Sequence, residues 1–495
     1  MGIVRSAIDV RAVELRARSG IITLRDISIT IDHGELIAII GGRKSGKEAL
    51  LEVMGGVRIP SSGTIDRRSG NIGYVPTEDV LHPQLPLTRA LGYAASLRGL
   101  PAVTVAESLA TVELAGRADS LVGDLALGER RRAALALALL GAPSLLFLDE
   151  PASGADPVEH ARLMRLLRAF TDDGMTVVMT ATNPPDAERC DKVAVLADGG
   201  HLAFFGTPDA ARDYFGADSM EEIYERLAGA ADPMAAWSRR YFRFPRTSLG
   251  DSPLFFFSPG RAETDPDPVG DPEPRPVAGA RDEPGPRRQL AVLVARNADV
   301  LCRTRRLTGA LLAGPPLAAL VALSVLFRAG PFHGTALLWL AFSGFFFGLA
   351  LGLPQVIAEQ GIFRYERRPD PGAYGPGVYV LAKAAVLLPP LIVLDALFLV
   401  LLDVLGGMPG FSRFGPTYLT LLLCTAAALG TGLLISAAAR APYWAAIALP
   451  AAFFPLLLAS YGVAAGHAGW PDWLLLAVVT AAMFAAACRY LSRDA

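Results

Sequence analysis

The sequence is poor in charged residues and has no excess of basic ones. Asp, Glu, Lys and Arg make up 19% of the 495 residues, whereas soluble domains carry about 25%. Hydrophobic residues make up 52%, so the composition excludes a wholly disordered chain and argues against an ordinary soluble enzyme. The formal net charge is −2. Because no basic surplus is available to neutralise phosphates, we expect no nucleic-acid binding.

Lysine and cysteine are also scarce. Nearly all basic residues are arginines, and the lysines are Lys44, Lys47, Lys192 and Lys383. Two of them fall in one glycine-rich stretch, so we expect them to act on a ligand rather than to solubilise the surface. The four cysteines are scattered, without the paired spacing of a zinc site or a disulfide framework.

The apolar residues are concentrated in the second part of the chain. We expect four segments: a domain at 1–236, a flexible linker rich in Pro, Asp and Arg at 237–288, an amphipathic connecting helix at 289–306, and a membrane domain at 307–495. The linker cannot bury enough apolar surface to order itself. The N-terminus lacks the apolar core of a signal peptide, so the first domain is expected in the cytoplasm.

Six apolar stretches are each about as long as a bilayer core requires. They lie near 307–327, 335–357, 378–402, 417–438, 443–465 and 471–488. Arginines precede the first stretch, separate the second from the third and follow the sixth, which indicates the cytoplasmic side. We therefore expect both termini in the cytoplasm.

Asp395 lies near the middle of the third apolar stretch. A charged group there is costly if it faces lipid, so we expect it to face the protein interior or a cavity between subunits. A structural hydrogen bond between helices and a role in substrate binding both remain open.

A glycine-rich segment in the first domain has the context of a phosphate-binding loop. It follows an apolar strand expected at 35–40 and opens a helix expected at 47–54, and its residues are Gly41, Gly42, Arg43, Lys44, Ser45, Gly46, Lys47, Glu48 and Ala49. Backbone N–H groups and a helix N-terminus attract phosphate oxygens, and the Lys47 side chain is expected to reach the β- and γ-phosphates. The position that usually supplies a hydroxyl to Mg²⁺ holds Glu48. A glycine-rich turn without a ligand is the alternative.

A second feature strengthens that interpretation. The apolar strand at 145–148 ends in Asp149 and Glu150. We expect Asp149 to hold Mg²⁺ and Glu150 to polarise the attacking water. The structural alternative is a strand end capped by two acids, but the pair about 100 residues after a phosphate loop is uncommon.

These motifs resemble those of half-size ABC transporters of subfamily G, the white/pleiotropic drug resistance type, with an ATP-binding domain fused to an ABC-2 type permease. The matching segments are 73–83 (Q-loop region), 125–132 (signature), 150–157 (D-loop), 190–193, 204–208 and 362–383. The resemblance implies an α/β P-loop NTPase domain followed by an all-α domain of six transmembrane helices.

The resemblance also implies further ATP contacts, several of which depart from the family pattern. The implied residues are Thr77, Gly128, Glu129, Asp156 and Thr182. Thr77 replaces the Q-loop glutamine, and Thr182 replaces the switch histidine. Ala126 and Leu127 replace the signature Ser and first Gly. Glu48 replaces the residue whose hydroxyl binds Mg²⁺, and we name it with Asp149 as a candidate metal ligand.

The sequence thus predicts a transporter subunit that uses ATP and Mg²⁺, exports an unknown substrate and dimerises with a second half transporter. We expect it in a lipid membrane of bacterial plasma-membrane type, with weakened hydrolysis. The alternative is a nucleotide-sensing or regulatory membrane subunit that hydrolyses little beside a competent partner. A purely structural membrane protein is the third option, and the intact acid pair argues against it.

Overall fold

The computed structural model describes residues 6–17, 20–68, 70–228, 284–328, 336–367, 374–406, 414–439 and 470–493. Contacts divide the chain into two compact units. The first comprises Met1–Asp79, Gly99–Ser120 and Leu125–Glu283, and the second comprises Val80–Arg98, Leu121–Asp124 and Pro284–Ala495. The boundaries expected from the sequence place residues 80–98 in the first domain, whereas contacts group these residues with the helical second unit. The expected domain boundaries stay predictions.

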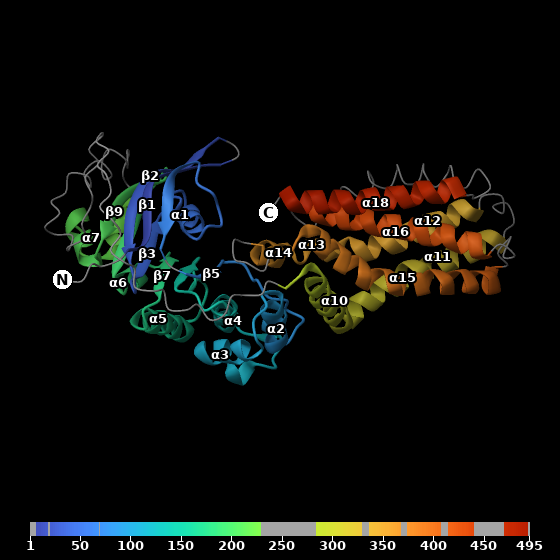
Figure 1. The fold of residues 1–495 in the computed structure, drawn as a ribbon, viewed down its shortest axis with the longest axis horizontal. Helices are drawn as coiled ribbons and strands as arrows, with labels where there is room; N and C mark the ends of the chain where they lie inside the picture. The colour runs from blue at the N-terminus through green and yellow to red at the C-terminus, as the bar shows by residue number, and fades with distance from the viewer. Residues whose placement is uncertain are drawn as a thin grey trace. The chain divides into compact units, whose positions relative to one another are not determined.

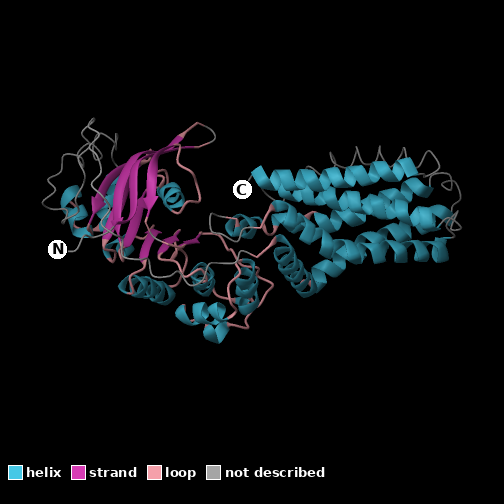
Figure 2. Cartoon of the chain, in the orientation of Figure 1, coloured by secondary structure: helices cyan, strands magenta, loops and turns pink. Residues whose placement is uncertain are grey.

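The first unit is built on one mixed sheet, drawn in magenta in Figure 2. Its strands are β1 (Ser6–Arg16), β2 (Ile22–Asp32), β3 (Leu36–Gly41), β4 (Ser62–Arg67), β5 (Ile72–Val75), β6 (Leu145–Leu148), β7 (Thr176–Thr180), β8 (Lys192–Ala197) and β9 (His201–Gly206). Their order is β4-β1-β2-β9-β8-β3-β7-β6-β5. Strands β5, β6, β7, β3 and β8 run parallel to one another, whereas β9 is antiparallel to β8. Parallel strands bring their carboxyl ends to one edge, where ligands of open α/β sheets bind.

Some helices of this unit pack directly against the sheet, and others pack on neighbouring helices (Figure 1). They are α1 (Lys47–Met54), α3 (Val103–Thr111), α4 (Leu127–Leu139), α5 (Pro157–Asp172), α6 (Pro184–Glu188), α7 (Pro208–Phe215) and α8 (Met220–Ala228), with a 3-10 turn at Ala115–Arg117. The core joins the buried faces of β1, β2 and β3 to the apolar face of α1. The expected α/β domain and the helix at 47–54 are confirmed, and β8 and β9 form an antiparallel hairpin.

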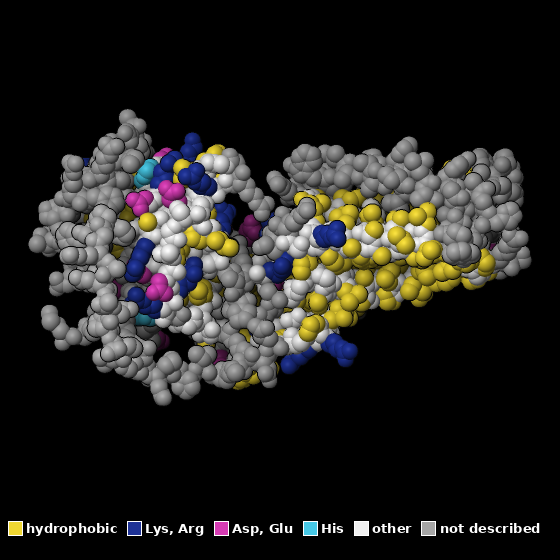
Figure 3. All heavy atoms as spheres, turned by 45° about the horizontal axis from the view of Figure 1, so that its top comes forward, with side chains coloured by type: hydrophobic (Ala, Val, Ile, Leu, Met, Phe, Trp, Pro, Cys, Tyr) yellow, Lys and Arg dark blue, Asp and Glu magenta, His cyan; other side chains and the backbone are white. Residues whose placement is uncertain are grey.

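The second unit is helical. Its elements are α2 (Leu87–Leu97), a 3-10 turn at Val122–Asp124, α10 (Pro286–Arg303), α11 (Arg305–Arg328), α12 (Ala336–Gly352), α13 (Pro354–Ile357), α14 (Gln360–Glu366), α15 (Pro376–Gly406), α16 (Phe414–Ala438) and α18 (Trp470–Arg493). Among the described residues, five helices are long and apolar enough to cross a membrane. Figure 3 shows their largely hydrophobic surface. The stretch expected at 443–465 lies outside the described residues.

The connecting helix starts and stops slightly earlier than expected. The sequence predicted a helix at 289–306, but α10 begins at Pro286 and ends at Arg303, with Thr304 as its C-cap. Proline fits the first turn of a helix because its missing N–H has no partner there anyway. At the other end, the Thr304 hydroxyl donates to the carbonyl of Val300 at 3.0 Å. A separate helix, α11, then begins at Arg305.

Two membrane helices, α12 and α16, approach each other unusually closely. A Cβ atom on Gly348 would stand 2.1 Å from the carbonyl oxygen of Thr425, and one on Gly352 would stand 2.8 Å from that of Leu429. Only glycine permits such an approach, as is usual for helix pairs in membranes. Asp395 of α15 is 0% exposed in the single chain, so the prediction that it faces the protein interior is confirmed.

A buried polar network lies where α10, α14 and the start of α15 meet within the second unit. Glu359 accepts hydrogen bonds from Lys383 Nζ at 2.7 Å and from the Tyr379 hydroxyl at 2.8 Å. Arg296 and Glu366 form a second pair at 2.5 Å. Each buried charge therefore has an opposite charge beside it, as a low-dielectric environment demands.

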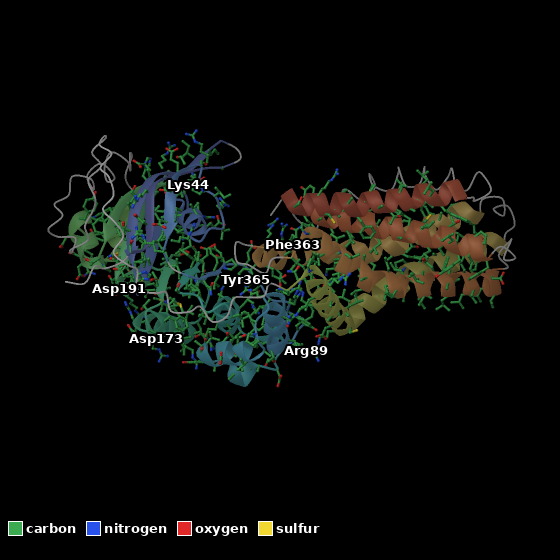
Figure 4. All side chains as sticks on the ribbon, viewed as in Figure 1. Lys44, Arg89, Asp173, Asp191, Phe363 and Tyr365 are labelled. Atoms are coloured by element: carbon green, nitrogen blue, oxygen red, sulfur yellow. The ribbon has the colours of Figure 1, made fainter. Side chains whose placement is uncertain are left out.

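The segment before and within α2 belongs to the same network. Arg89 of α2, labelled in Figure 4, forms an ion pair with Asp299 of α10 at 2.8 Å. His82 is 4% exposed, and its Nδ1 lies 3.9 Å from a Glu359 carboxylate oxygen. Residues that follow the expected Q-loop are thus built into the helical unit.

Candidate nucleotide site

The phosphate-loop residues form a tight turn between β3 and α1. Ser45 N–H donates to the Gly42 carbonyl at 3.1 Å, and Gly46 caps α1 with a φ of 80°. A side chain at Gly46 would stand 2.6 Å from the Thr23 carbonyl oxygen, so the turn depends on glycine both for its backbone angle and for space. Lys44 lies in this loop (Figure 4) and is exposed, as are Gly42 and Arg43.

Lys47, at the start of α1, is the centre of the site. Its Nζ lies 2.5 Å from Glu150 Oε1 and 3.2 Å from Thr182 Oγ1. The Thr182 hydroxyl donates in turn to Glu150 Oε1 at 2.6 Å. These three side chains therefore form a closed triangle of hydrogen bonds. In the sequence, Glu150 lies 103 positions from Lys47 and 32 positions from Thr182.

Two threonine hydroxyls hold the neighbouring acid. Thr77 donates to Asp149 Oδ2 at 2.9 Å, and Thr180 donates to Asp149 Oδ1 at 2.7 Å. Thr180 Oγ1 also accepts the backbone N–H of Glu150 at 2.8 Å. That bond supports Glu150 in a left-handed backbone conformation, with a φ of 44°, which costs energy for a residue other than glycine.

The electrostatics keep Glu150 ionised. Burial raises the pKa of its carboxyl, but hydrogen bonds from Lys47 and Thr182 together with the Lys47 charge outweigh burial and leave the pKa below its ordinary value. A carboxylate stabilised in this way is ready to accept a hydrogen bond from water, although its present partners are Lys47 and Thr182.

Gly128, Glu129 and Asp156 stabilise the signature segment and the D-loop to which they belong. Gly128 in the first turn of α4 packs so closely on α5 that a Cβ there would stand 2.8 Å from Glu159 Cβ. Glu129 accepts the backbone N–H of Ala126 at 3.0 Å, and Arg117 lowers the pKa of Glu129 by a hydrogen bond. Asp156 caps α5 by accepting the N–H groups of Val158 and Glu159. In the described part of the chain no hydrogen bond or ion pair joins these three residues to Lys47 or Glu150.

The residues present fit a phosphate group better than a fully protein-held metal. Ser45 Oγ is buried without a hydrogen-bond partner, and it lies in the loop whose backbone N–H groups suit phosphate oxygens. The described residues contain no cluster of three or more His, Cys, Asp and Glu side chains that could hold a metal ion. Mg²⁺ usually rests on one or two carboxylates together with substrate phosphates and water, and Asp149 suits that role. Glu48 is exposed in the first turn of α1.

Sequence reasoning missed Thr180. In the sheet, β6 and β7 are parallel neighbours in which Leu148 pairs with Met179. The residues that follow them, Asp149 and Thr180, are therefore side by side at the carboxyl edge. A threonine at the end of an apolar strand carries no motif of its own, and the neighbourhood of the two strands had to be known first.

Comparison with known proteins gives a consistent result. Residues 24–153 match the family described as ABC transporter, and residues 288–486 match the family described as ABC-2 type transporter. The chain belongs to the ABC proteins that carry both domains in one polypeptide. The ABC ATPase domain implies nucleotide binding, and the ABC-2 domain with its apolar helices makes this a membrane protein.

Relatives of this ABC protein include the "ABC transporter ATP-binding/permease protein Rv1747" of Mycobacterium tuberculosis, 31% identical over 81% of this chain and 47% of that protein. "ABC transporter G family member 26" of Arabidopsis thaliana is 33% identical over 39% of this chain and 31% of its own length. The chain thus spans about half or less of the relatives it matches. A solved "ATP binding subunit of ABC transporter" is 25% identical and covers 45% of this chain and 100% of its own, with a TM-score of 0.41.

Proposed function

We propose that this protein is a half-size ABC exporter that works as a dimer and is driven by ATP. One observation carries the proposal: Lys47 of the phosphate loop meets Glu150, at the end of β6, within 2.5 Å, in a chain that also has an ABC-2 membrane domain. A basic phosphate ligand next to a carboxylate positioned for water is the arrangement that phosphoryl transfer requires. The exported substrate stays unassigned.

The proposed roles follow from these contacts. Residues 41–49 bind the phosphates, with Lys47 on the β- and γ-phosphates and Ser45 on a phosphate oxygen. Asp149, with Glu48 beside the loop, holds Mg²⁺, which neutralises charge on the transferring phosphate. Glu150 is the proposed catalytic base. Gly128, Glu129 and Asp156 contact the nucleotide bound to the second subunit, whose identity as the same or another chain is open.

Hydrolysis is expected to be slow when both subunits are this chain. The Thr77 and Thr182 hydroxyl groups donate hydrogen bonds to Asp149 and Glu150, whereas the glutamine and histidine of typical members are larger and reach toward the nucleotide. Leu127 occupies a signature position where small residues are usual. Loss of one preorganised donor costs about 10²–10³ in rate, and because groups that act together are not additive, we expect a large loss rather than the product.

An experiment on the full chain in lipid tests the proposal. ATP binding is measured by equilibrium titration with the wild type and Lys47→Ala. Arg43→Ala is the matched control, because it removes an exposed side chain and keeps the backbone N–H through which that residue of the loop would bind phosphate. We expect Lys47→Ala to weaken binding at least tenfold and Arg43→Ala to change it little. Equal binding by all three proteins would contradict a phosphate site at this loop.

A second candidate is a nucleotide-sensing regulatory subunit that works beside a competent half transporter. The closed triangle of Lys47, Glu150 and Thr182 favours it, because both key side chains are already engaged with each other. In such a heterodimer the partner would supply the signature residues and switch histidine that this chain lacks. Co-reconstitution separates the two: ATPase activity that requires an added partner supports the regulatory subunit, whereas transport by the chain alone supports the exporter.

The proposed location is a plasma membrane of bacterial type, with the ATPase domain and both termini in the cytoplasm. The support is the placement of arginine next to the apolar helices: Arg303 precedes α11, Arg364 lies in α14 and Arg489 lies near the end of α18. Arginine is enriched on the cytoplasmic side of membrane proteins.

A further inference from the structure

Asp395 differs from the other buried acid of the membrane unit. Glu359 has Lys383 and Tyr379 as partners. Asp395 is 0% exposed, and neither carboxylate oxygen has a hydrogen-bond partner in the described structure. It lies ten residues before the end of the apolar span Pro376–Leu405, about 15 Å along a helix. Its surroundings are therefore apolar and distant from bulk water.

A second buried polar group without a hydrogen-bond partner, the Thr425 hydroxyl of α16, lies next to Asp395. The Thr425 side chain is 0% exposed, and its hydroxyl oxygen also lacks a hydrogen-bond partner. The two side chains interact across the α15–α16 contact without meeting hydrogen-bond geometry. Two unpartnered polar groups that face each other in an apolar core call for an explanation, because natural proteins satisfy nearly all such groups.

Among the residues that the structure describes, no cation forms an ion pair with Asp395. The sequences of α12 and α16 contain no charged residue. On α16 the Asp395 charge acts on Tyr418 and Cys424, neither of which can carry a positive charge. Lys383 on the same helix is 12 residues away and bound to Glu359. Helices α11 and α18 carry their charged residues near their ends.

Among the described helices, α12 packs too closely on Thr425 to leave space for a large ligand between them. On the α12 side, a Cβ on Gly344 would stand 2.8 Å from Thr425 Oγ1 and 2.6 Å from Leu421 Cδ1, so even a methyl group does not fit. An isolated carboxylate in such an environment is strongly disfavoured. A proton is the cation that neutralises it without displacing any side chain.

We propose that Asp395 and Thr425 form a proton-binding site inside the membrane domain. Asp395 holds the proton as a neutral carboxylic acid, whose O–H donates to Thr425 Oγ1 after a small side-chain rotation. The packed helices bind the proton more tightly than any arrangement in which Asp395 meets water. By linkage, a step that opens the bundle at Asp395 releases a proton to water, and acidification favours the packed arrangement.

The test is infrared difference spectroscopy of the full chain in lipid vesicles, with aspartate labelled by ¹³C at the carboxyl carbon. At pH 6, well above the value of about 3.9 at which an exposed aspartate ionises, we expect a protonated-carboxyl band that shifts with the label and in D₂O. Asp395→Asn, which is nearly isosteric, should remove it. Asp403→Asn, on the same helix and partly exposed, should leave it unchanged. Thr425→Val should shift the band to higher frequency by removing its acceptor.

Two results would overturn the proposal. The first is a labelled wild-type protein with no protonated aspartate band at pH 6, which needs no variant and does not depend on the folding of one. The second is a band that persists in Asp395→Asn. Neither result bears on ATP binding, so failure here is distinct from failure of the proposed transporter function.

Discussion

The ion pair between Lys47 and Glu150 allows a quantitative prediction of how Glu150→Gln changes the affinity for ATP. The two charged atoms are 2.5 Å apart, and the side chains are 8% and 20% exposed. Phosphate can engage Lys47 fully only after this pair has separated. Glu150→Gln removes the negative charge and so removes part of that cost, which means that the variant should bind ATP more tightly than the wild type.

The magnitude follows from the kind of contact. A hydrogen bond between charged groups contributes about 1.5–3 kcal/mol. Because Glu150 is partly exposed, water recovers some of this energy when the pair separates, and about 1–2 kcal/mol remains. That difference corresponds to a decrease in Kd of about 5- to 30-fold.

The assay is fluorescence titration of a nucleotide analogue against the full chain in lipid, with EDTA present so that metal binding does not enter. Asp149→Asn is the control, because it removes a neighbouring negative charge whose hydrogen bonds go to Thr77 and Thr180 rather than to Lys47. Glu150→Gln should tighten binding clearly more than Asp149→Asn. Equal effects would mean that general repulsion of phosphate, and not the pair with Lys47, governs affinity.

Three further predictions concern the loop, the polar network and the topology. Gly46→Ala forces a side chain into a φ of 80° against the Thr23 carbonyl, so nucleotide titration should show binding lost and thermal unfolding a destabilisation of about 1–3 kcal/mol; unchanged values would refute the strain. Burial lowers the pKa of His82 from 6.5 to about 4, so the unfolded chain binds more protons between these values and stability should fall by up to about 3 kcal/mol as pH drops from 6.5 to 4. Thermal unfolding of His82→Phe should lack this loss, and an equally acid-sensitive variant would contradict the assignment. In a Cys302→Ser background, a cysteine at position 364 should react with an impermeant reagent only from the cytoplasmic side and one at 413 only from the opposite side; the reverse pattern, or labelling of both from one side, would overturn the topology.

The sequence was most informative where local chemistry is decisive. The helix at 47–54 begins at a lysine after a glycine-rich turn, and β6 ends at two acids; both features are confirmed. The apolar helices were evident because a bilayer requires a fixed length of apolar chain. The interior position of Asp395 followed from the cost of a charge in lipid and is confirmed.

The remaining features depend on contacts between distant segments. The hydrogen bonds from Thr182 to Glu150 and from Thr180 to Asp149 follow from strand order, which no local pattern encodes. Strands β1 and β4 pair antiparallel at the edge of the sheet. Their exposed positions interrupt the alternation of buried and exposed residues by which a strand is predicted from sequence. The inclusion of residues 80–98 in the helical unit rests on pairs such as Arg89 with Asp299, 210 positions apart.

The decisive measurement for weakened ATP hydrolysis is the steady-state ATPase activity of the purified chain in lipid, with Glu150→Gln as the blank. We expect the wild type to bind ATP yet to turn it over at least about 100-fold more slowly than a variant with the usual residues restored at positions 48, 77, 126, 127 and 182. The small wild-type activity should vanish in Glu150→Gln. Rapid turnover by the unaltered chain, abolished in Glu150→Gln, would show that the threonines and Leu127 do not weaken this site.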